Sequence, residues 1–392
     1  TGSFDVYKGN IPAEFGGRLS SVFDIKTKDS NTEKFSGEVA IGPVTSNIAL
    51  EIPIVKDKTA VLIGGRSTYS DWILNVLDDE QLQNSSAFFY DAIVKFNTKI
   101  GEKDDLKTTI YYSKDRFSIT SDSTYNYSNR LLTGRWNHHF NDKSTSSVIV
   151  TNSVYKFNID YDGVSNNDFD FGYQNSETEL KIKGLYKLNP KHKINYGISS
   201  KLYGISPGEL KPKGSESIVI PKTISDEQGL ESAVFISDIF KINKKLIINA
   251  GLRYSLYLGL GESNQLVYED GLPKNEATVI DTIQYKKNEV IKNYGGPEFR
   301  FSARYLLGNE YSVKASVNNT NQYIHSLSNN TTVSPVDTWT LSDANIKPQK
   351  AIQYSLGFYK NLNDNMYQFS IEGYYKSTKN VLDYKVCSYF II

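Results

Sequence analysis

Few residues in this 392-residue sequence have the type and spacing that chemistry requires, and the best match fails on inspection. Gly204-Ile205-Ser206-Pro207-Gly208 fits the G-x-S-x-G pattern of serine hydrolases. In those enzymes the residue after the serine donates its backbone N–H to the oxyanion, and Pro207 has no N–H to donate. The segment is also predicted to be a loop rather than a strand-to-helix turn. We therefore expect no hydrolase site here.

Metal ligation has equally little support. His138 and His139 are adjacent on a predicted strand and so point to opposite faces, while His192 and His325 lie in a turn and a loop. The acidic run 160–170 lacks the spacing and the terminal glutamate of an EF-hand, so we expect a solvated loop. The one cysteine, Cys387, cannot form a disulfide framework. We expect no metal site, no cofactor and no enzymatic activity.

The composition narrows the class of protein. Lysine and arginine together number 44, as do aspartate and glutamate, so charge gives no reason to expect a nucleic-acid partner. No apolar run approaches the ~20 residues that a transmembrane helix needs. A membrane β-barrel stays compatible, because its strands alternate apolar and polar residues and keep the average hydropathy low.

Strict alternation of apolar and polar residues is the dominant pattern and predicts an all-β, antiparallel fold. The polar positions include Arg253 in Leu246–Leu258, and Arg300 and Arg304 in Glu298–Leu307. Two arginines on one face of a strand do not suit a dry core, but they suit a sheet with lipid on one side and a wet interior on the other. The alternative is an antiparallel sheet of a soluble protein, with its apolar face on a core.

The lengths of the connections favour the membrane barrel, because outer-membrane barrels have short periplasmic turns and long extracellular loops. About fifteen strands are predicted from residue 34 onward, the last near 366–376. In the first long segment, Ser70–Leu82 is expected to form a short helix with Trp72 packed inward. The short links are Val55–Lys58, Gly101–Asp105, Asn141–Ser144, Asn189–Lys193, Asn243–Lys245, Gly308–Glu310 and Asn361–Asn365, and the long segments lie near 70–88, 119–128, 160–171, 205–230, 259–296 and 325–350.

An odd number of strands would leave an unpaired edge, since single-chain bacterial barrels have even strand numbers. No turn and return strand follow Tyr374-Tyr375-Lys376 before the terminal VCSYFII. The expectation is therefore a fragment cut at both ends, with a truncation or a frameshift at its C-terminal end.

These residues carry a resemblance to a family. The run YKGNIPAEFGGRLSSVFDIKTKDSN resembles the end of the plug domain in TonB-dependent outer-membrane receptors, with its Gly-rich turn and its strand closing on Thr-Lys. The run FSGEVAIGPVTSNIALEIPIV looks like the first barrel strands of Bacteroidota-type members, and the region around Pro335-Val336-Asp337-Thr338-Trp339 is similar to their mid-barrel. The resemblance implies a plug end at 1–30 and a partial transmembrane β-barrel at 31–392, with about 15 of roughly 22 parental strands.

The resemblance also implies roles for residues near the plug end. Gly16 and Gly17 would allow a tight backbone path out of the plug. Arg18 would pair with a carboxylate of the barrel wall, and Glu14 would make a second plug–barrel contact. From the residues alone, the two glycines are equally a simple turn and Arg18 a solvated charge.

Candidate ligand-binding residues lie in a long loop of the predicted barrel. Tyr323, His325, Asp337 and Trp339 combine stacking surfaces with polar groups, as a sugar, haem or siderophore site would. The alternative is structural, because aromatic residues at strand ends form membrane-interface girdles and a loop tryptophan often packs against its own loop.

The function that the resemblance implies is active uptake of a scarce solute, such as a siderophore, glycan or cobalamin, across the outer membrane of a Gram-negative, Bacteroidota-type cell. Extracellular loops would capture the solute, and TonB, energised by ExbB and ExbD, would pull on the plug. The other expected partners are outer-membrane lipid and, as an optional partner, a surface lipoprotein. The alternatives are a passive porin or adhesin without a plug, and a soluble antiparallel β-sheet binding protein.

Overall fold

The computed structural model describes residues 2–74, 76, 83, 85–120, 122–163, 166–308, 310–327, 339–362 and 366–382. Strands dominate these residues, and the named helical elements are α1 (Asp71–Leu74) and the 3-10 turn η1 (Glu276–Thr278). The predicted all-β class is therefore confirmed. Within the same ranges, no helix has the length and the apolar composition needed to cross a membrane.

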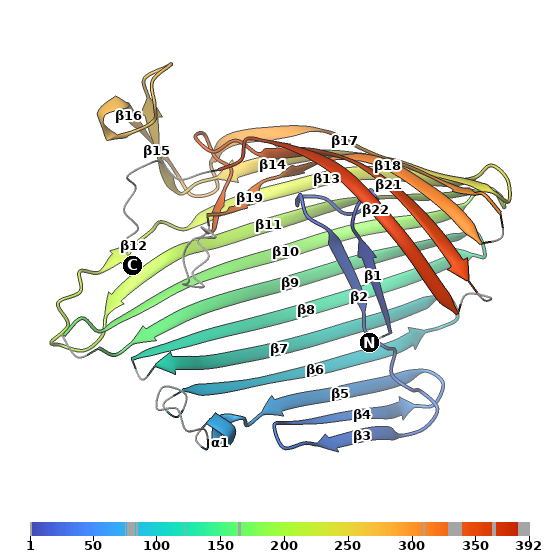
Figure 1. Ribbon diagram of the computed structural model, residues 1–392, viewed down its shortest axis with the longest axis horizontal. Helices are drawn as coiled ribbons and strands as arrows, with labels where there is room; N and C mark the ends of the chain where they lie inside the picture. The colour runs from blue at the N-terminus through green and yellow to red at the C-terminus, as the bar shows by residue number, and fades with distance from the viewer. Residues whose placement is uncertain are drawn as a thin grey trace. The chain divides into compact units, whose positions relative to one another are not determined.

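Most strands belong to one antiparallel sheet of 16 strands (Figure 1). Fifteen of them are hydrogen-bonded neighbours in chain order, and β12 (Lys222–Thr223) pairs with β11 off this path. About fifteen strands were expected from residue 34 onward, and the structure agrees. The fifteen are β3 (Ser36–Ile41), β4 (Thr45–Val55), β5 (Thr59–Thr68), β6 (Ser86–Ile100), β7 (Asp104–Thr120), β8 (Ser123–Asn141), β9 (Ser144–Tyr161), β10 (Phe169–Lys187), β11 (His192–Pro212), β13 (Glu227–Lys241), β14 (Leu246–Leu260), β17 (Val290–Leu306), β18 (Tyr311–Gln322), β21 (Gln349–Leu362) and β22 (Tyr367–Lys379).

The chain divides into two compact units, each described here by itself. The first contains mainly residues 27–182 and 201–227, and the second contains residues 3–26, 183–200 and 228–392. Three small hairpins lie outside the large sheet, and all three belong to the second unit. They are β1 (Ser3–Tyr7) with β2 (Val22–Lys26), β15 (Ser263–Tyr268) with β16 (Val279–Tyr285), and β19 (Ile324–Ser326) with β20 (Trp339–Leu341).

Asparagine explains how several of the short connections close. The Oδ1 atom of Asn141 accepts the N–H of Lys143 at 2.9 Å, and Asn243 accepts the N–H of Lys245 at 2.8 Å. A side chain that bonds the backbone two residues on replaces one turn of backbone hydrogen bonding, which is why asparagine favours turns. Each strand is thereby reversed within a few residues and pairs with the next strand.

The two faces of the sheet in the second unit differ as the alternation predicts. On β14, Leu252 and Tyr254 are each 52% exposed, whereas the intervening Arg253 is 4% exposed and Ser255 is fully buried. Apolar side chains are thus exposed and polar ones are covered, the reverse of a soluble sheet on an apolar core. We call these the apolar face and the polar face of the sheet; the polar face carries the candidate site.

Several details differ from the sequence-based expectation. Strand β7 ends at Thr120 and β8 begins at Ser123, so most of the long segment expected near 119–128 is strand, and His192 and His325 lie on β11 and β19 rather than in a turn and a loop. Strand β11 continues to Pro212, so Gly204–Gly208 lies within a strand and not in a loop. The helix over 70–82 is described only as α1, and Trp72 on it is 52% exposed rather than packed inward, with its Nε1 donating to the carbonyl of Pro43 at 3.0 Å. The indole N–H is thus satisfied by the loop between β3 and β4 while much of the ring stays exposed.

Candidate functional site: two docked N-terminal segments

The N-terminal segment (residues 8–21) joins β1 to β2 and lies on the polar face of the second unit. Strands β1 and β2 pair with Tyr7 opposite Val22, which brings the two ends of the segment together. Its middle is covered, since Ile11 is 5% exposed and Ala13 is 1% exposed. The segment is therefore docked on the sheet and not a free tail.

Side chains of the sheet hold the segment mainly by its backbone. Gly17 forms an isolated parallel bridge with Gln322, whose Oε1 also accepts the N–H of Leu19 at 2.9 Å. Arg300 donates to the carbonyl of Phe15 at 3.3 Å. Further bonds run from Ser316 Oγ to Gly9 O at 3.2 Å, from Gln353 Nε2 to Lys8 O at 3.3 Å, and from Lys376 Nζ to Leu19 O.

The glycine pair lies where the segment comes closest to the sheet. A Cβ atom on Gly16 would overlap the guanidinium of Arg253, and a Cβ on Gly17 would overlap the carboxylate of Glu231. Gly17 also has φ +77°, a conformation that side-chain-bearing residues rarely adopt. The sequence singled out these two positions, and the geometry gives the reason that both are glycine.

Two buried ion pairs of the sheet lie directly under this turn, and we call them the floor of the site. Arg253 Nη2 lies 3.4 Å from Glu231 Oε1, and Arg300 Nη2 lies 2.9 Å from Glu298 Oε2. All four side chains are at most 4% exposed. Charges buried to this extent need partners, because removing one leaves its partner charged and dehydrated.

Hydrogen bonds extend this floor toward the β19–β20 hairpin. Glu298 Oε1 accepts from Ser255 Oγ at 3.0 Å and from Asn321 Nδ2 at 3.2 Å. Ser255 Oγ also lies 2.8 Å from the hydroxyl of Tyr323, whose ring stacks on that of Tyr257 at 4.7 Å. One polar network therefore connects the N-terminal segment with the base of the hairpin.

Glu14 and Arg18, the other two residues proposed at the plug–barrel contact, lie on either side of the glycine pair. Glu14 Oε2 is 2.6 Å from Lys183 Nζ on β10, a contact between the segment and the sheet. Arg18 Nη1 donates to the carbonyl of its neighbour Gly17 at 3.2 Å. The pairing of Arg18 with a carboxylate stays a prediction.

A second docked segment, which the sequence did not indicate, is the exit segment (residues 27–31) of the first unit. Lys95 on β6 is 3% exposed and donates to the carbonyl of Thr27 at 3.0 Å, the carbonyl of Lys28 at 2.8 Å and the carboxylate of Asp29 at 2.9 Å. Lys107 on β7 adds a bond to Asp29 at 2.7 Å. The available signal was Lys95 itself, one of several polar residues that alternate with apolar ones along β6.

These contacts pair the charged side chains of the exit segment with groups of opposite charge. Burial raises the pKa of Asp29, but the hydrogen bonds from Lys107 and Lys95 outweigh burial, so its pKa lies below the ordinary value. Lys28 pairs with Glu51 at 2.7 Å, and the same carboxylate accepts the N–H of Asn31 at 2.7 Å. At neutral pH the exit segment is thus held by ionised groups.

The proposed ligand-binding residues differ in how far they are buried. Tyr323 is 1% exposed and His325 is fully buried, with its Nε2 2.8 Å from Ser342 Oγ, whereas Trp339 on β20 is half-buried. Burial, with a smaller contribution from the positive charge of Arg18, lowers the pKa of His325 to about 4. Asp337 lies outside the described residues. A direct role in binding stays a prediction for all four, and Tyr323 and His325 would need the hairpin to open.

Two carboxylates of the acidic run 160–170 share one lysine of the first unit. Lys213 Nζ lies 2.6 Å from Asp160 and 2.9 Å from Asp162, and these hydrogen bonds raise the pKa of Lys213 above its ordinary value. Across the ranges that the structure describes, no group of three or more His, Cys, Asp or Glu side chains is arranged to hold a metal ion. His138 instead bonds Asp104, with 2.7 Å between Nδ1 and Oδ1.

Comparison with known proteins identifies the family to which the sheet belongs. A family model described as "TonB dependent receptor-like, beta-barrel" matches residues 59–390. No curated protein matches the sequence.

Three solved structures are similar to the chain. FpvA of P. aeruginosa, bound to a heterologous pyoverdine with iron, gives a TM-score of 0.65 at 12% identity over 95% of this chain and 52% of that chain. The copper transporter OprC gives 0.66 at 10% identity over 95% and 58%, and the alcaligin outer-membrane receptor FauA from Bordetella pertussis gives 0.65 at 11% over 98% and 58%. The chain thus spans little more than half the length of these structures, and at such identities the likeness shows the fold alone.

Proposed function

The chain belongs to the TonB-dependent receptor-like β-barrel family, whose members are outer-membrane receptors, and from this premise we propose that it serves the active uptake of a solute across the outer membrane. Residues 1–30 would be the end of a plug domain and residues 31–392 part of the barrel, in a receptor of the Bacteroidota type with about 22 strands.

The observation that carries this proposal is the docking of the N-terminal segment on the polar face. A passive porin needs no segment on this face, whereas a gated receptor needs one that closes the lumen and can be displaced. Contacts spread over several side chains, from Lys183 on β10 to Lys376 on β22, suit such a segment. Each is one ion pair or hydrogen bond, so water can replace them in turn.

The solute and partners follow from the family. Similar structures include receptors bound to ferric pyoverdine and to a haem-carrying hemophore, and a copper transporter, so a scarce metal complex is one solute class; a glycan or cobalamin is another. TonB, energised by ExbB and ExbD, would supply the force on the plug. A surface lipoprotein would assist capture if the solute is a glycan.

The test is energised uptake by the full-length receptor in cells with and without TonB. Cells are supplied with one limiting solute at a time, as ferric siderophore, haem, cobalamin or oligosaccharide, and growth and solute accumulation are measured. We expect uptake of one class that is lost without TonB and after collapse of the proton-motive force. Uptake that persists under both conditions would instead identify a passive pore.

A further inference from the structure

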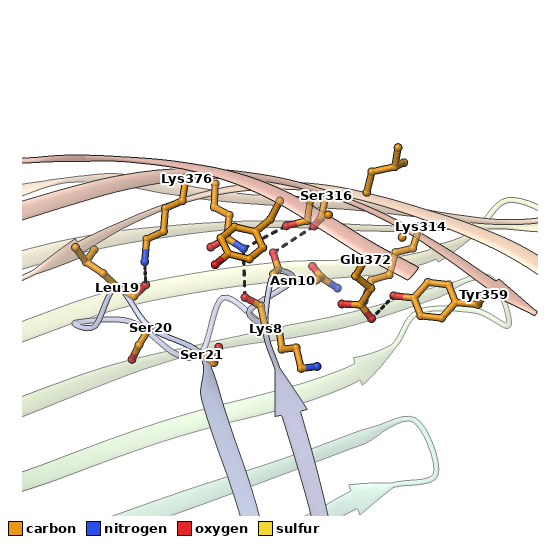
Figure 2. Close-up of a pocket in the computed structure, with 17 residues that line it drawn as sticks. Lys8, Asn10, Leu19, Ser20, Ser21, Lys314, Ser316, Tyr359, Glu372 and Lys376 are labelled. Carbon is orange, nitrogen blue, oxygen red and sulfur yellow. Dashed lines mark hydrogen bonds between the residues drawn. The ribbon is translucent and has the colours of Figure 1, made fainter. Parts of the chain in front are cut away.

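A polar cavity of about 430 Å³ lies between the N-terminal segment and strands β18, β21 and β22 of the second unit (Figure 2). The segment contributes Lys8 to Asn10 and Leu19 to Ser21, and the sheet contributes mainly residues of its polar face, together with Leu356 and Gly373. The volume lies within the range of ligand pockets, roughly 300–1,000 Å³. This cavity is separate from the ion pairs under Gly16 and Gly17, none of whose side chains line it.

The charge of the cavity is unbalanced. Lys8, Lys314 and Lys376 line it, and Glu372 is the one acidic residue among its lining residues. Tyr359 donates to Glu372 at 2.9 Å, and Lys376 donates to the carbonyl of Leu19, so these side chains are engaged (Figure 2). The excess charge of the lining is therefore positive.

Two of the ammonium groups make no direct ion pair in the cavity; Lys314 is attracted by Glu372, but it is also repelled by Arg304. Among the described residues, neither Lys8 nor Lys314 makes a side-chain hydrogen bond or an ion pair, and Ser20 and Ser21 add hydroxyl groups that are equally unengaged. Lys314 is half-buried on β18, and Glu372, whose carboxylate also accepts from Tyr359, is the one acidic group that attracts it within the lining, so its dehydrated charge is only partly compensated. An anion in the cavity would remove this penalty.

The basic lining continues into a second cavity of about 460 Å³, which shares Lys314 and Tyr359 with the first. It adds Arg304 together with the polar side chains of Ser312, Asn361, Gln368 and Ser370. The first cavity lies against the middle of β21 and β22, and the second lies toward the ends of β17, β18, β21 and β22 where the short connections are. A solute that passed the N-terminal segment toward the short-turn side would meet this basic strip.

We propose that these two cavities form an inner binding site for a small polyanionic solute, one that carries two or more carboxylate or phosphate groups. Lysine suits this task, because its ammonium is a flexible point charge that attracts anions of many shapes, whereas arginine fixes one bidentate geometry. The site names a substrate class for the uptake proposed above and rests on that proposal for the direction of movement. Binding itself does not depend on it.

The test is isothermal titration of the full-length receptor in detergent with citrate, a small tricarboxylate, and with its neutral trimethyl ester. We expect citrate to bind, the ester not to bind, and salt to weaken the affinity for citrate. Lys314→Gln should weaken citrate binding roughly three- to tenfold, and Lys8→Gln less, because Lys8 is exposed. Lys314→Arg keeps the charge and should retain binding, and Lys350→Gln, on β21 but outside both linings, is the matched control.

A second measurement reports the electrostatic potential of the cavity while all three lysines are still present. In a Cys387→Ser background, Ser20→Cys places one thiol in the cavity lining, and its reaction with an anionic and a cationic methanethiosulfonate reports the local potential. We expect the anionic reagent to react faster, and this advantage to fall when Lys314→Gln is added. The inference is overturned if citrate fails to bind at millimolar concentration, if Lys314→Gln with Lys8→Gln binds as well as the unchanged protein, or if both reagents react alike. TonB-independent uptake alongside intact citrate binding would sink the proposed function and leave this site standing.

Discussion

The N-terminal segment and the exit segment are both held by residues far from them in sequence, but the contacts are distributed differently. The N-terminal segment is held at many points, each by one hydrogen bond or ion pair, as between Gln322 and the N–H of Leu19. In the exit segment, Lys107 and Glu51 add contacts, but most of the bonds to residues 27–29 come from one buried side chain, Lys95, which uses all three of its N–H bonds there.

This difference has consequences for how each segment can move. Single hydrogen bonds contribute about 1 kcal/mol each, so a segment held by several of them can be released stepwise, with water taking over one contact at a time. Lys95 has given up its hydration for three acceptors, and releasing residues 27–29 removes all three together. We therefore expect the exit segment to be the fixed end and the N-terminal segment to be the releasable one.

The largest effect is expected from Gly17→Ala, which should loosen the N-terminal segment alone. The new Cβ overlaps the carboxylate of Glu231, and alanine is unfavourable at the positive φ of this position. The free energy of opening of the N-terminal segment should therefore fall by about 2–4 kcal/mol. Hydrogen exchange of residues 11–19 in the full-length receptor measures this. Gly101→Ala is the control, because Gly101 has φ +78° and no neighbour within 4 Å; an equal loss in both variants would show that the backbone conformation, and not the docking, is responsible.

A smaller but local effect is expected from Lys95→Met, which should release the exit segment and leave the N-terminal segment docked. The carbonyls of Thr27 and Lys28 lose their donor, so the free energy of opening of residues 27–31 should fall by about 2 kcal/mol. Hydrogen exchange or limited proteolysis of this segment measures it. Lys107→Met removes the other, more exposed partner of Asp29 and should cost under about 1 kcal/mol; the reverse order of the two variants would contradict a single dominant contact.

The smallest effect is a dependence on pH at the β19–β20 hairpin, next to the docking site of the N-terminal segment. The pKa of His325 is about 4 in the folded hairpin and ordinarily 6.5, so the open hairpin takes up the proton first as the pH falls. Stability from this residue is complete above pH 6.5 and is lost between pH 6.5 and 4, with about 1 kcal/mol gone at pH 5.5. Exchange of residues 324–326, corrected for intrinsic rates, measures the loss; if His325→Gln keeps the same pH dependence, another group is responsible.

The sequence was sufficient for the strands because alternation is a local property with period two. Arg253 and Leu252 are assigned to opposite faces by their positions alone, and their exposures agree. The length of β11 was missed because Gly204 to Gly208 have turn-forming residues, whereas pairing with neighbouring strands keeps them extended.

The site was harder to predict, since its contacts depend on register and on residues hundreds of positions apart. The glycine pair could be identified from type alone, but its neighbours Glu231 and Arg253 could not, because any polar position of several strands was an equal candidate. Lys95 was visible only as one polar residue in a strand. Its three acceptors are backbone carbonyls and a carboxylate of a segment without a distinctive pattern.

The distant origin of the contacts also sets an order on folding. Leu19 is separated by 303 residues from Gln322 and by 357 from Lys376, the side chains that bond its N–H and its carbonyl. Closing loops of this size is slow, and no local contact can substitute for them. The N-terminal segment is therefore synthesised early but docks late, after β18 and β22 have joined the sheet.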